Sequence, residues 1–157
     1  MPPMPLHKTE YQFRVTLPAS RERAFRWATD YRPTDLSLMG EEGRRHVEHL
    51  AENTILLTDI FRTARGPVTK VKLVHLLPDQ FAWTNTHLAG PSRHSQFLYE
   101  LLPTGRNRCQ LRFTGLQVDH PARRPTASFV AGRARELVRE DSATWRRLAA
   151  AMGRDTA

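Results

Sequence analysis

The C-terminal segment is the most constraining feature of the chain, because it predicts one long amphipathic helix. From Thr126 to Met152 it contains a single glycine and no proline. Gly153 follows at the position where a glycine in the left-handed backbone conformation usually ends a helix. Its apolar residues recur at steps of three, four or seven, the period of a helix with one apolar face: Phe129, Val130, Leu137, Val138, Trp145, Leu148, Ala149 and Met152. We expect the charged residues of the opposite face to be solvated, namely Arg133, Arg135, Arg139, Glu140, Arg146 and Arg147. At 1.5 Å per residue the helix spans roughly 40 Å, so the rest of the chain must supply a broad sheet.

The preceding residues predict that sheet. Residues 10–17 alternate apolar and polar side chains, which indicates a half-buried strand. Residues 20–30 predict a short helix, and residues 34–39 predict one or two further helical turns. Beyond them the period is two, and turn residues divide the chain into six strands: 44–51, 53–63, 67–77, 80–88, 93–102 and 107–118. Because no helix interrupts these strands, we expect consecutive strands to pair as antiparallel hairpins.

Odd-numbered positions carry the apolar residues in nearly every predicted strand. They are Tyr11, Phe13, Val15, Ile55, Leu57, Phe61, Val71, Leu73, Phe81, Trp83, Phe97, Tyr99, Leu101, Cys109, Leu111 and Phe113. Hairpins whose paired residue numbers sum to even values keep the odd residues on one face of the sheet. We therefore expect these residues to form the concave face that contacts the helix.

This order of elements resembles the helix-grip fold of the START, polyketide-cyclase and pollen-allergen-like superfamily, often called SRPBCC. The segment VTLPASRERAFRWATDY, from Val15 to Tyr31, is similar to that family's opening: a strand, a proline-alanine-serine turn, and a helix with one bulky aromatic residue and a final aspartate. The resemblance covers about Thr9 to Met152. It implies an α+β fold in which a seven-stranded antiparallel curved sheet wraps around the C-terminal helix, with two short helices after the first strand. It also implies an elongated cavity that commonly holds an apolar or amphipathic ligand. The family has no universal catalytic residues to carry over.

Composition limits the other possibilities. We expect a flexible lead over residues 1–8 and a single domain over residues 9–153. The net charge of +8 is spread along the chain rather than clustered, so nucleic acid is not expected as the main partner. The sequence has no run of eighteen apolar residues, no signal-peptide core, and only one cysteine, Cys109, which together predict a cytoplasmic protein without a transmembrane segment. No nucleotide-binding motif and no tight histidine spacing occurs, so we expect neither a cofactor nor a metal.

Several polar residues share the odd positions of the expected cavity wall: His49, Asp59, His75, Asn85, His87, Ser95 and Tyr99. An unpaired buried polar group costs about 1–3 kcal/mol, so such residues call for a reason. Four of them are candidate catalytic acids and bases, His75, His87, Asp59 and Tyr99. The alternative is structural: Asp59 would pair with Lys70 or Lys72 outside the cavity, and Asn85 with Ser95 across strands. The predicted ligand-binding residues are Phe81, Trp83, Asn85, Ser95, Phe97, Leu111, Phe113, Phe129, Gly132 and Leu137.

The function predicted first is the binding, with or without transport, of a small hydrophobic ligand such as a lipid, a sterol or a polyketide-like molecule. A second hypothesis is a polyketide cyclase, dehydratase or isomerase that uses the histidine, aspartate and tyrosine candidates without a metal or nucleotide cofactor. A third is a protein-interaction module that uses the arginine-rich surface. The sequence does not predict the oligomeric state.

Overall fold

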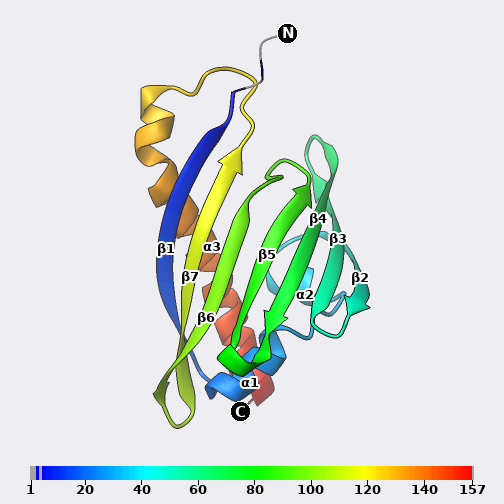
Figure 1. The fold of residues 1–157 in the computed structure, drawn as a ribbon, viewed down its shortest axis with the longest axis vertical. Coiled ribbons are helices and arrows are strands. Elements are labelled where there is room, and N and C mark those ends of the chain that lie inside the picture. The colour runs from blue at the N-terminus through cyan, green and yellow to red at the C-terminus, as the bar shows by residue number, and fades with distance from the viewer. Residues whose placement is uncertain (1–2, 4, 157) are drawn as a thin grey trace.

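Seven strands and a long C-terminal helix make up the protein, whose computed structural model describes residue 3 and residues 5–156 (Figure 1). In chain order the elements are β1 (His7–Leu17), α1 (Arg21–Ala28), α2 (Asp35–Leu38), β2 (Gly43–Ala51), β3 (Thr54–Thr63), β4 (Gly66–Leu77), the 3₁₀ helix η1 (Pro78–Gln80), β5 (Ala82–Ala89), β6 (Gln96–Gly105), β7 (Arg108–Asp119) and α3 (Ala127–Thr156). The strands form one antiparallel sheet in the order β1-β7-β6-β5-β4-β3-β2. The predicted α+β architecture is confirmed.

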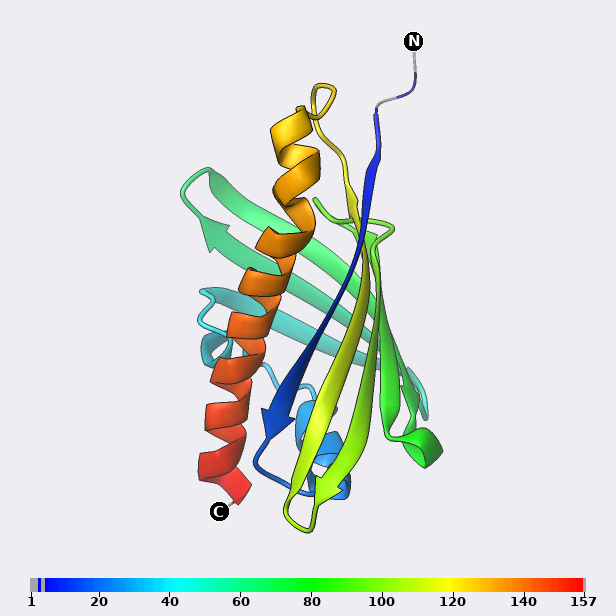
Figure 2. The ribbon, with the colours of Figure 1, turned by 90° about the vertical axis from the view of Figure 1, so that its left-hand side faces the viewer.

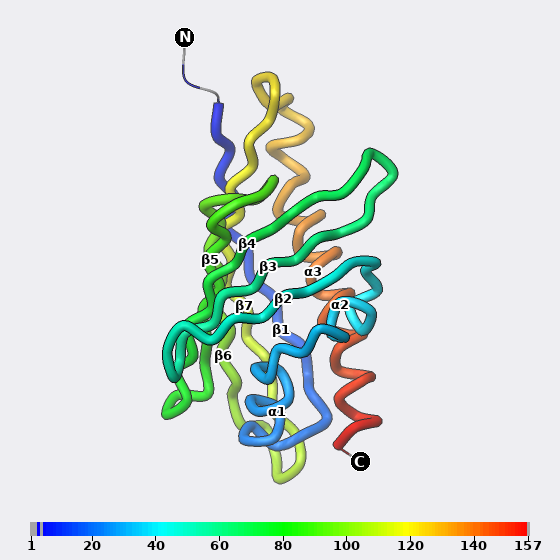
Figure 3. Tube along the Cα trace, turned by 90° about the vertical axis from the view of Figure 1, so that its right-hand side faces the viewer, coloured from blue at the N-terminus to red at the C-terminus, as the bar shows by residue number. Residues whose placement is uncertain are grey.

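The sheet curves around α3, which runs along its concave side next to β1 (Figure 2). Seen from the other side, α2 lies between the β2 edge of the sheet and α3 (Figure 3). The sheet and α3 therefore bury most of the apolar residues that their periodicity placed inward, although Val130, expected on the apolar face of α3, is 50% exposed. The core includes residues that are almost completely inaccessible to solvent, among them Leu17, Trp83, Leu111 and Met152.

Two predicted boundaries are wrong. His7 and Lys8, expected in the flexible lead, belong to β1, because they pair with Asp119 and Val118 of β7. Residues 1, 2 and 4 of that lead lie outside the described residues. The helix α3 continues past Gly153 to Thr156. A Cβ atom at Gly153 would lie 3.2 Å from the Pro18 side chain, so this glycine permits close packing against Pro18 instead of stopping the helix.

The alternation of inward and outward residues breaks in β4. Thr63 and Gly66 pair directly, so only two residues form the turn between β3 and β4. Such a turn pairs odd-numbered residues of β3 with even-numbered residues of β4. Because the odd residues of β3 face inward, the even residues of β4 face inward too, as the burial of Lys72 and Val74 shows. The pairing of Leu77 with Ala82 around η1 restores odd positions inward in β5. The prediction that odd positions of β4 face the helix is therefore wrong for Val71, Leu73 and His75, and His75 is exposed on the outer face.

Candidate ligand-binding cavity

A cavity of about 520 Å³ lies between the inner face of the sheet and α3. Its volume falls within the range of small-molecule sites, about 300–1,000 Å³. Residues of α1, of the segment that carries α2, of β2 to β7 and of α3 line it. The strands supply about half of the lining residues, and the α2 segment and α3 close the cavity from the opposite side. The cavity wall has an aromatic part and a charged part.

Stacked aromatic rings form the first part of the wall. Trp83 of β5 and Tyr99 of β6 are directly paired in the sheet, and their rings stack in parallel with centroids 4.9 Å apart and an interplanar angle of 4°. The Trp145 ring of α3 lies 6.2 Å from Trp83 and 5.8 Å from Tyr99. Phe97 and Phe113 stack beside them with centroids 5.6 Å apart. These rings form the apolar, aromatic part of the cavity wall.

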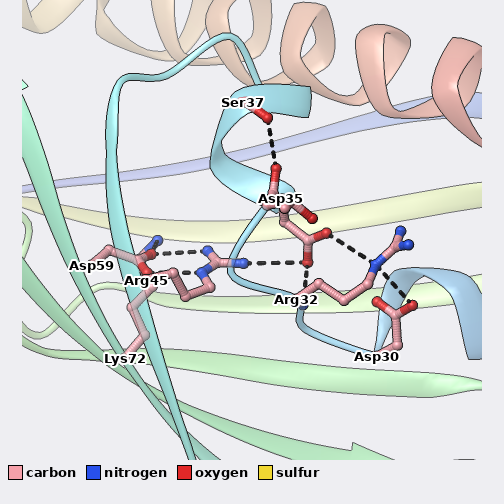
Figure 4. A network of polar contacts seen from close by, with 8 residues as sticks. Asp30, Arg32, Asp35, Ser37, Arg45, Asp59 and Lys72 are labelled. Atoms are coloured by element: carbon pink, nitrogen blue, oxygen red, sulfur yellow. Dashed lines mark hydrogen bonds and ion pairs between the residues drawn. The ribbon is translucent and has the colours of Figure 1, made fainter.

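The charged part of the wall is built around the fully buried carboxylate of Asp59 (Figure 4). Arg45 lies opposite Asp59 in the β2–β3 pairing and donates two hydrogen bonds to it, of 2.8 and 2.9 Å. Lys72 donates a third, of 2.9 Å, from β4. The second amino group of Arg45 lies 3.6 Å from the carboxylate of Asp35, in α2. We call Asp35, Arg45, Asp59 and Lys72 the Asp59 cluster.

The protonation state of Asp59 follows from these contacts. Burial by itself would raise the pKa of Asp59, but the hydrogen bonds and charges of Arg45 and Lys72 outweigh burial and lower that pKa. Burial lowers the pKa of Lys72, and Asp59 opposes this effect. Asp59 is therefore a carboxylate whose two oxygens are both occupied by cations. It is poorly placed to remove a proton from a ligand, because a general base must reach that proton directly.

Two buried polar atoms lie between the aromatic and charged parts of the wall. His87 lies directly opposite Lys72 in the β4–β5 pairing, and Asn85 precedes it by two residues on the same face. Among the described residues, neither Nδ1 of His87 nor Oδ1 of Asn85 has a hydrogen-bond partner. Burial, together with the charges of Lys72 and Lys70, lowers the pKa of His87 to about 3, so its ring is neutral near neutral pH. A ligand that pairs these atoms would recover about 1–3 kcal/mol for each.

The helix side of the cavity carries a second carboxylate, Asp141, which lines the cavity from α3. The hydroxyl of Tyr11 donates a hydrogen bond to it. Burial raises the pKa of Asp141, although Tyr11, Lys70 and Arg133 act in the opposite direction. Gly115 makes room for this contact, because a Cβ atom there would lie 2.7 Å from the Tyr11 ring.

The segment around α2 closes one side of the cavity through contacts on both of its flanks. Tyr31, Asp35 and Met39 line the cavity from this segment. The Asp35–Arg45 contact links the segment to the sheet. On the other flank, Arg147 of α3 donates a 3.2 Å hydrogen bond to the carbonyl oxygen of Met39. The segment is thus bound to both layers of the fold.

Comparisons with known proteins settle the fold. No protein-family model and no curated protein sequence matches the chain. Among solved structures, the Zhui aromatase/cyclase from Streptomyces sp. R1128 superposes with a TM-score of 0.75 at 16% identity, over 96% of this chain and 97% of that one. A START superfamily protein from Mycobacterium smegmatis gives 0.65 at 13% identity, over 92% and 94%. Norcoclaurine synthase from Thalictrum flavum gives 0.64 at 11% identity, over 96% and 87%. The chain has the helix-grip fold.

The predicted resemblance is thereby confirmed, and identities this low show the helix-grip fold alone. No helix in the described part of the chain is long and apolar enough to cross a membrane. The described residues also contain no group of three or more histidines, cysteines, aspartates or glutamates that could hold a metal ion.

Some of the predicted site residues meet in the helix-grip cavity. Of the four catalytic candidates, His87 and Tyr99 line it, Asp59 is buried behind it in the Asp59 cluster, and His75 lies on the outer face. His49 is exposed as well. The predicted ligand-binding residues that line the cavity are Trp83, Asn85, Phe97, Phe113 and Leu137.

The other predicted ligand-binding residues have structural positions outside the cavity lining. Phe81 contacts Phe25, and Leu111 is completely buried in the core. The hydroxyl of Ser95 accepts a 2.8 Å hydrogen bond from the Val118 amide, so the predicted pairing of Ser95 with Asn85 is wrong. The remaining two, Phe129 and Gly132, precede the part of α3 that lines the cavity, which begins at Arg133.

The sequence interpretation missed most of the charged lining: Arg45, Lys70, Lys72, Arg133, Glu140 and Asp141. Lys72 does pair with Asp59, as one alternative held, but inside the fold and not outside it. Arg133 was assigned to a solvated face, whereas it forms two hydrogen bonds to Asp119, of 2.8 and 2.9 Å. One signal was present in the sequence. The chain has only three lysines among its 24 basic residues, and two of them occupy alternate positions of one apolar strand.

Proposed function

We propose that this helix-grip protein binds a small, mainly apolar molecule that has a flat ring system and at least one hydroxyl or carbonyl group. The observation that carries the proposal is the juxtaposition, in one cavity, of stacked aromatic rings with two buried polar atoms, Asn85 Oδ1 and His87 Nδ1, that have no hydrogen-bond partner in the described part of the chain. The stacked rings favour a sterol-like or polyketide-like ligand over a flexible acyl chain, because a flat surface packs best against another flat surface. A role in transport and a cytoplasmic location stay predictions.

Two further considerations support a binding role. An interaction module of this fold would need no internal space, whereas this chain keeps a cavity of about 520 Å³ between sheet and helix. The structural relatives also include the norcoclaurine synthase, whose structure contains dopamine and hydroxybenzaldehyde. Both considerations favour a small organic ligand over a macromolecular partner that uses the arginine-rich surface.

The first test is native mass spectrometry of the purified protein, followed by organic extraction of any bound molecule. A panel of sterols, fatty acids and polycyclic phenols would then be titrated against the fluorescence of Trp83 and Trp145, which both line the cavity. We expect saturable binding of a ring compound. The proposal fails if nothing co-purifies and no member of the panel changes the fluorescence or the melting temperature.

A pair of variants makes the test specific for the cavity. Asn85→Leu keeps the side-chain shape but removes the unpaired oxygen, and should weaken a hydroxylated ligand by about tenfold, the effect of roughly one hydrogen bond. Thr84→Val removes a polar group from the neighbouring residue, which points to the other face of the sheet and does not line the cavity. It should leave the affinity unchanged. Equal effects of the two changes would contradict binding at this wall.

A second candidate function is acid–base catalysis of the cyclase or dehydratase type. It is favoured by the position of three titratable side chains, His87, Tyr99 and Asp141, on one cavity. His75 and Asp59 leave the set, since one faces outward and the other is held by two cations. If the protein is such an enzyme, His87→Ala should reduce turnover by roughly 10²–10⁴-fold while ligand binding persists. Turnover that survives this change would refute a catalytic role for His87.

A further inference from the structure

Among the described residues, Lys70 is the one cation on the sheet wall of the cavity that lies outside the Asp59 cluster. It lies on β4 at an even position, is half-buried and lines the cavity. Asp59 of β3 is the residue paired with Lys70 in the sheet, but Arg45 and Lys72 occupy both oxygens of its carboxylate. Within the described ranges Lys70 forms no ion pair. Its ammonium group lies 5.0 Å from the centre of the Phe61 ring, which also lines the cavity.

Counting charges shows that Lys70 is in excess. In the Asp59 cluster two positive side chains, Arg45 and Lys72, face two negative ones, Asp35 and Asp59. The four charges cancel. Arg32 also contacts Asp35, but it is paired with Asp30 as well, so Lys70 adds one positive charge to this side of the cavity. A buried or half-buried charge without a partner is unfavourable, and a ligand anion would remove that cost.

The opposite side of the cavity does not neutralise Lys70 directly. On that side the half-buried carboxylate of Asp141 accepts a hydrogen bond from the Tyr11 hydroxyl. Lys70 lowers the pKa of Asp141 from across the cavity but forms no ion pair with it. The other lining carboxylates outside the Asp59 cluster, Glu41 and Glu140, are exposed. The space between Lys70 and Asp141 is thus bordered by a donor on one side and by an acceptor on the other.

We infer that the ligand is an organic acid, a ring system that carries a carboxylate or a phenolate, and that Lys70 binds its negative group. This inference rests on the proposed binding function and specifies the class of ligand. The ring system would lie on the aromatic wall of Trp83 and Tyr99, with the acidic group at Lys70. Lys72 and the neutral His87, opposite each other in the sheet, border the same place. A hydrogen bond to a charged partner is stronger than one to a neutral partner, so the affinity should depend on whether the ligand carries a negative charge at this position.

The test compares two fluorescent probes that share one ring system and differ by a single anionic group. 1-Anilinonaphthalene-8-sulfonate carries a negative sulfonate group, and N-phenyl-1-naphthylamine is the same ring system without it. Both would be titrated against the intact protein, Lys70→Met and Lys70→Arg, with competition between the probes to show that they share one site. Lys8→Met is the matched control, because it removes the same charge from an exposed position of β1 outside the cavity.

We expect Lys70→Met to weaken the sulfonate probe by about tenfold to hundredfold, the effect of one charged hydrogen bond, and to leave the neutral probe unchanged. Lys70→Arg should retain most of the preference, and Lys8→Met should change neither probe. Equal losses for both probes in Lys70→Met, or no loss for either, would overturn the inference. A wild-type protein that binds only the neutral probe would overturn it as well, while leaving the binding function intact. If neither probe binds the wild-type protein at one saturable site, the proposed binding function itself fails.

Discussion

The Asp59 cluster makes a strong prediction about stability. Asp59→Asn keeps the size of the side chain but leaves Arg45 and Lys72 beside each other without their shared carboxylate. Both cations are largely buried, with side-chain exposures of 4% and 10%. Removing one partner of a buried ion pair typically costs about 3–5 kcal/mol, because the remaining charge stays desolvated. Lys72 can limit the loss by giving up its proton, since burial already lowers its pKa.

We therefore expect Asp59→Asn to lower the free energy of unfolding by about 3–5 kcal/mol. For a chain of this length that corresponds to a fall in melting temperature of roughly 6–20 °C. Urea denaturation followed by tryptophan fluorescence measures the change. Asp79→Asn is the control, because Asp79 is exposed and forms no ion pair among the described residues.

A further variant separates the stability contributed by the ion pairs from the free-energy cost of leaving buried charges without a partner. The triple change Arg45→Met, Asp59→Leu and Lys72→Met removes all three charges together. Buried ion pairs often exchange for apolar residues at little cost, so the triple variant should be more stable than Asp59→Asn. A loss below about 1 kcal/mol for Asp59→Asn, the size expected of a surface ion pair, would refute this account of the cluster.

The remaining predictions concern pH, packing and the α2 segment. His87 stays neutral in the folded protein down to about pH 3, whereas an unfolded chain protonates it below about pH 6.5. The free energy of unfolding should therefore fall as pH is lowered through this window, by up to about 1.4 kcal/mol per pH unit. His87→Gln should abolish that contribution in denaturation curves measured across the window. Gly115→Ala puts a Cβ atom 2.7 Å from the Tyr11 ring, so it should destabilise the protein by about 1–3 kcal/mol and displace the Tyr11–Asp141 hydrogen bond; an unchanged melting temperature would contradict this. Arg147→Met removes the hydrogen bond to the Met39 carbonyl, so amide hydrogen exchange of residues 33–42 should become faster while exchange in the sheet stays the same.

Much of the fold could be predicted because it is encoded locally. The 3.6-residue period of α3, the two-residue period of the strands and the turn residues between them act within short segments, and the observed elements follow them. The aromatic wall could be predicted for the same reason, since Trp83, Phe97, Tyr99 and Phe113 keep the parity of their strands. Each of these features depends on residues close to one another in the chain.

The charged wall could not be predicted in this way. The inward direction of Lys70 and Lys72 depends on one property of the β3–β4 connection, the direct pairing of Thr63 with Gly66. A turn longer by one residue would turn both lysines outward and His75 inward, and the sequence is compatible with either length. The same uncertainty of register explains why His75 was taken as a candidate base.

The sequence by itself determined the architecture: one curved antiparallel sheet, a long helix against it, and an aromatic inner face. Only the tertiary structure decided the chemistry of the cavity. It placed Arg45 and Lys72, from the two strands that flank β3, around the buried carboxylate of Asp59, and within the described residues it left Lys70 without an ion-pair partner on the same wall. The physical reason is that periodicity is a property of one segment, whereas a charge is balanced or left unbalanced by its neighbours in space, and these come from segments far apart in the chain.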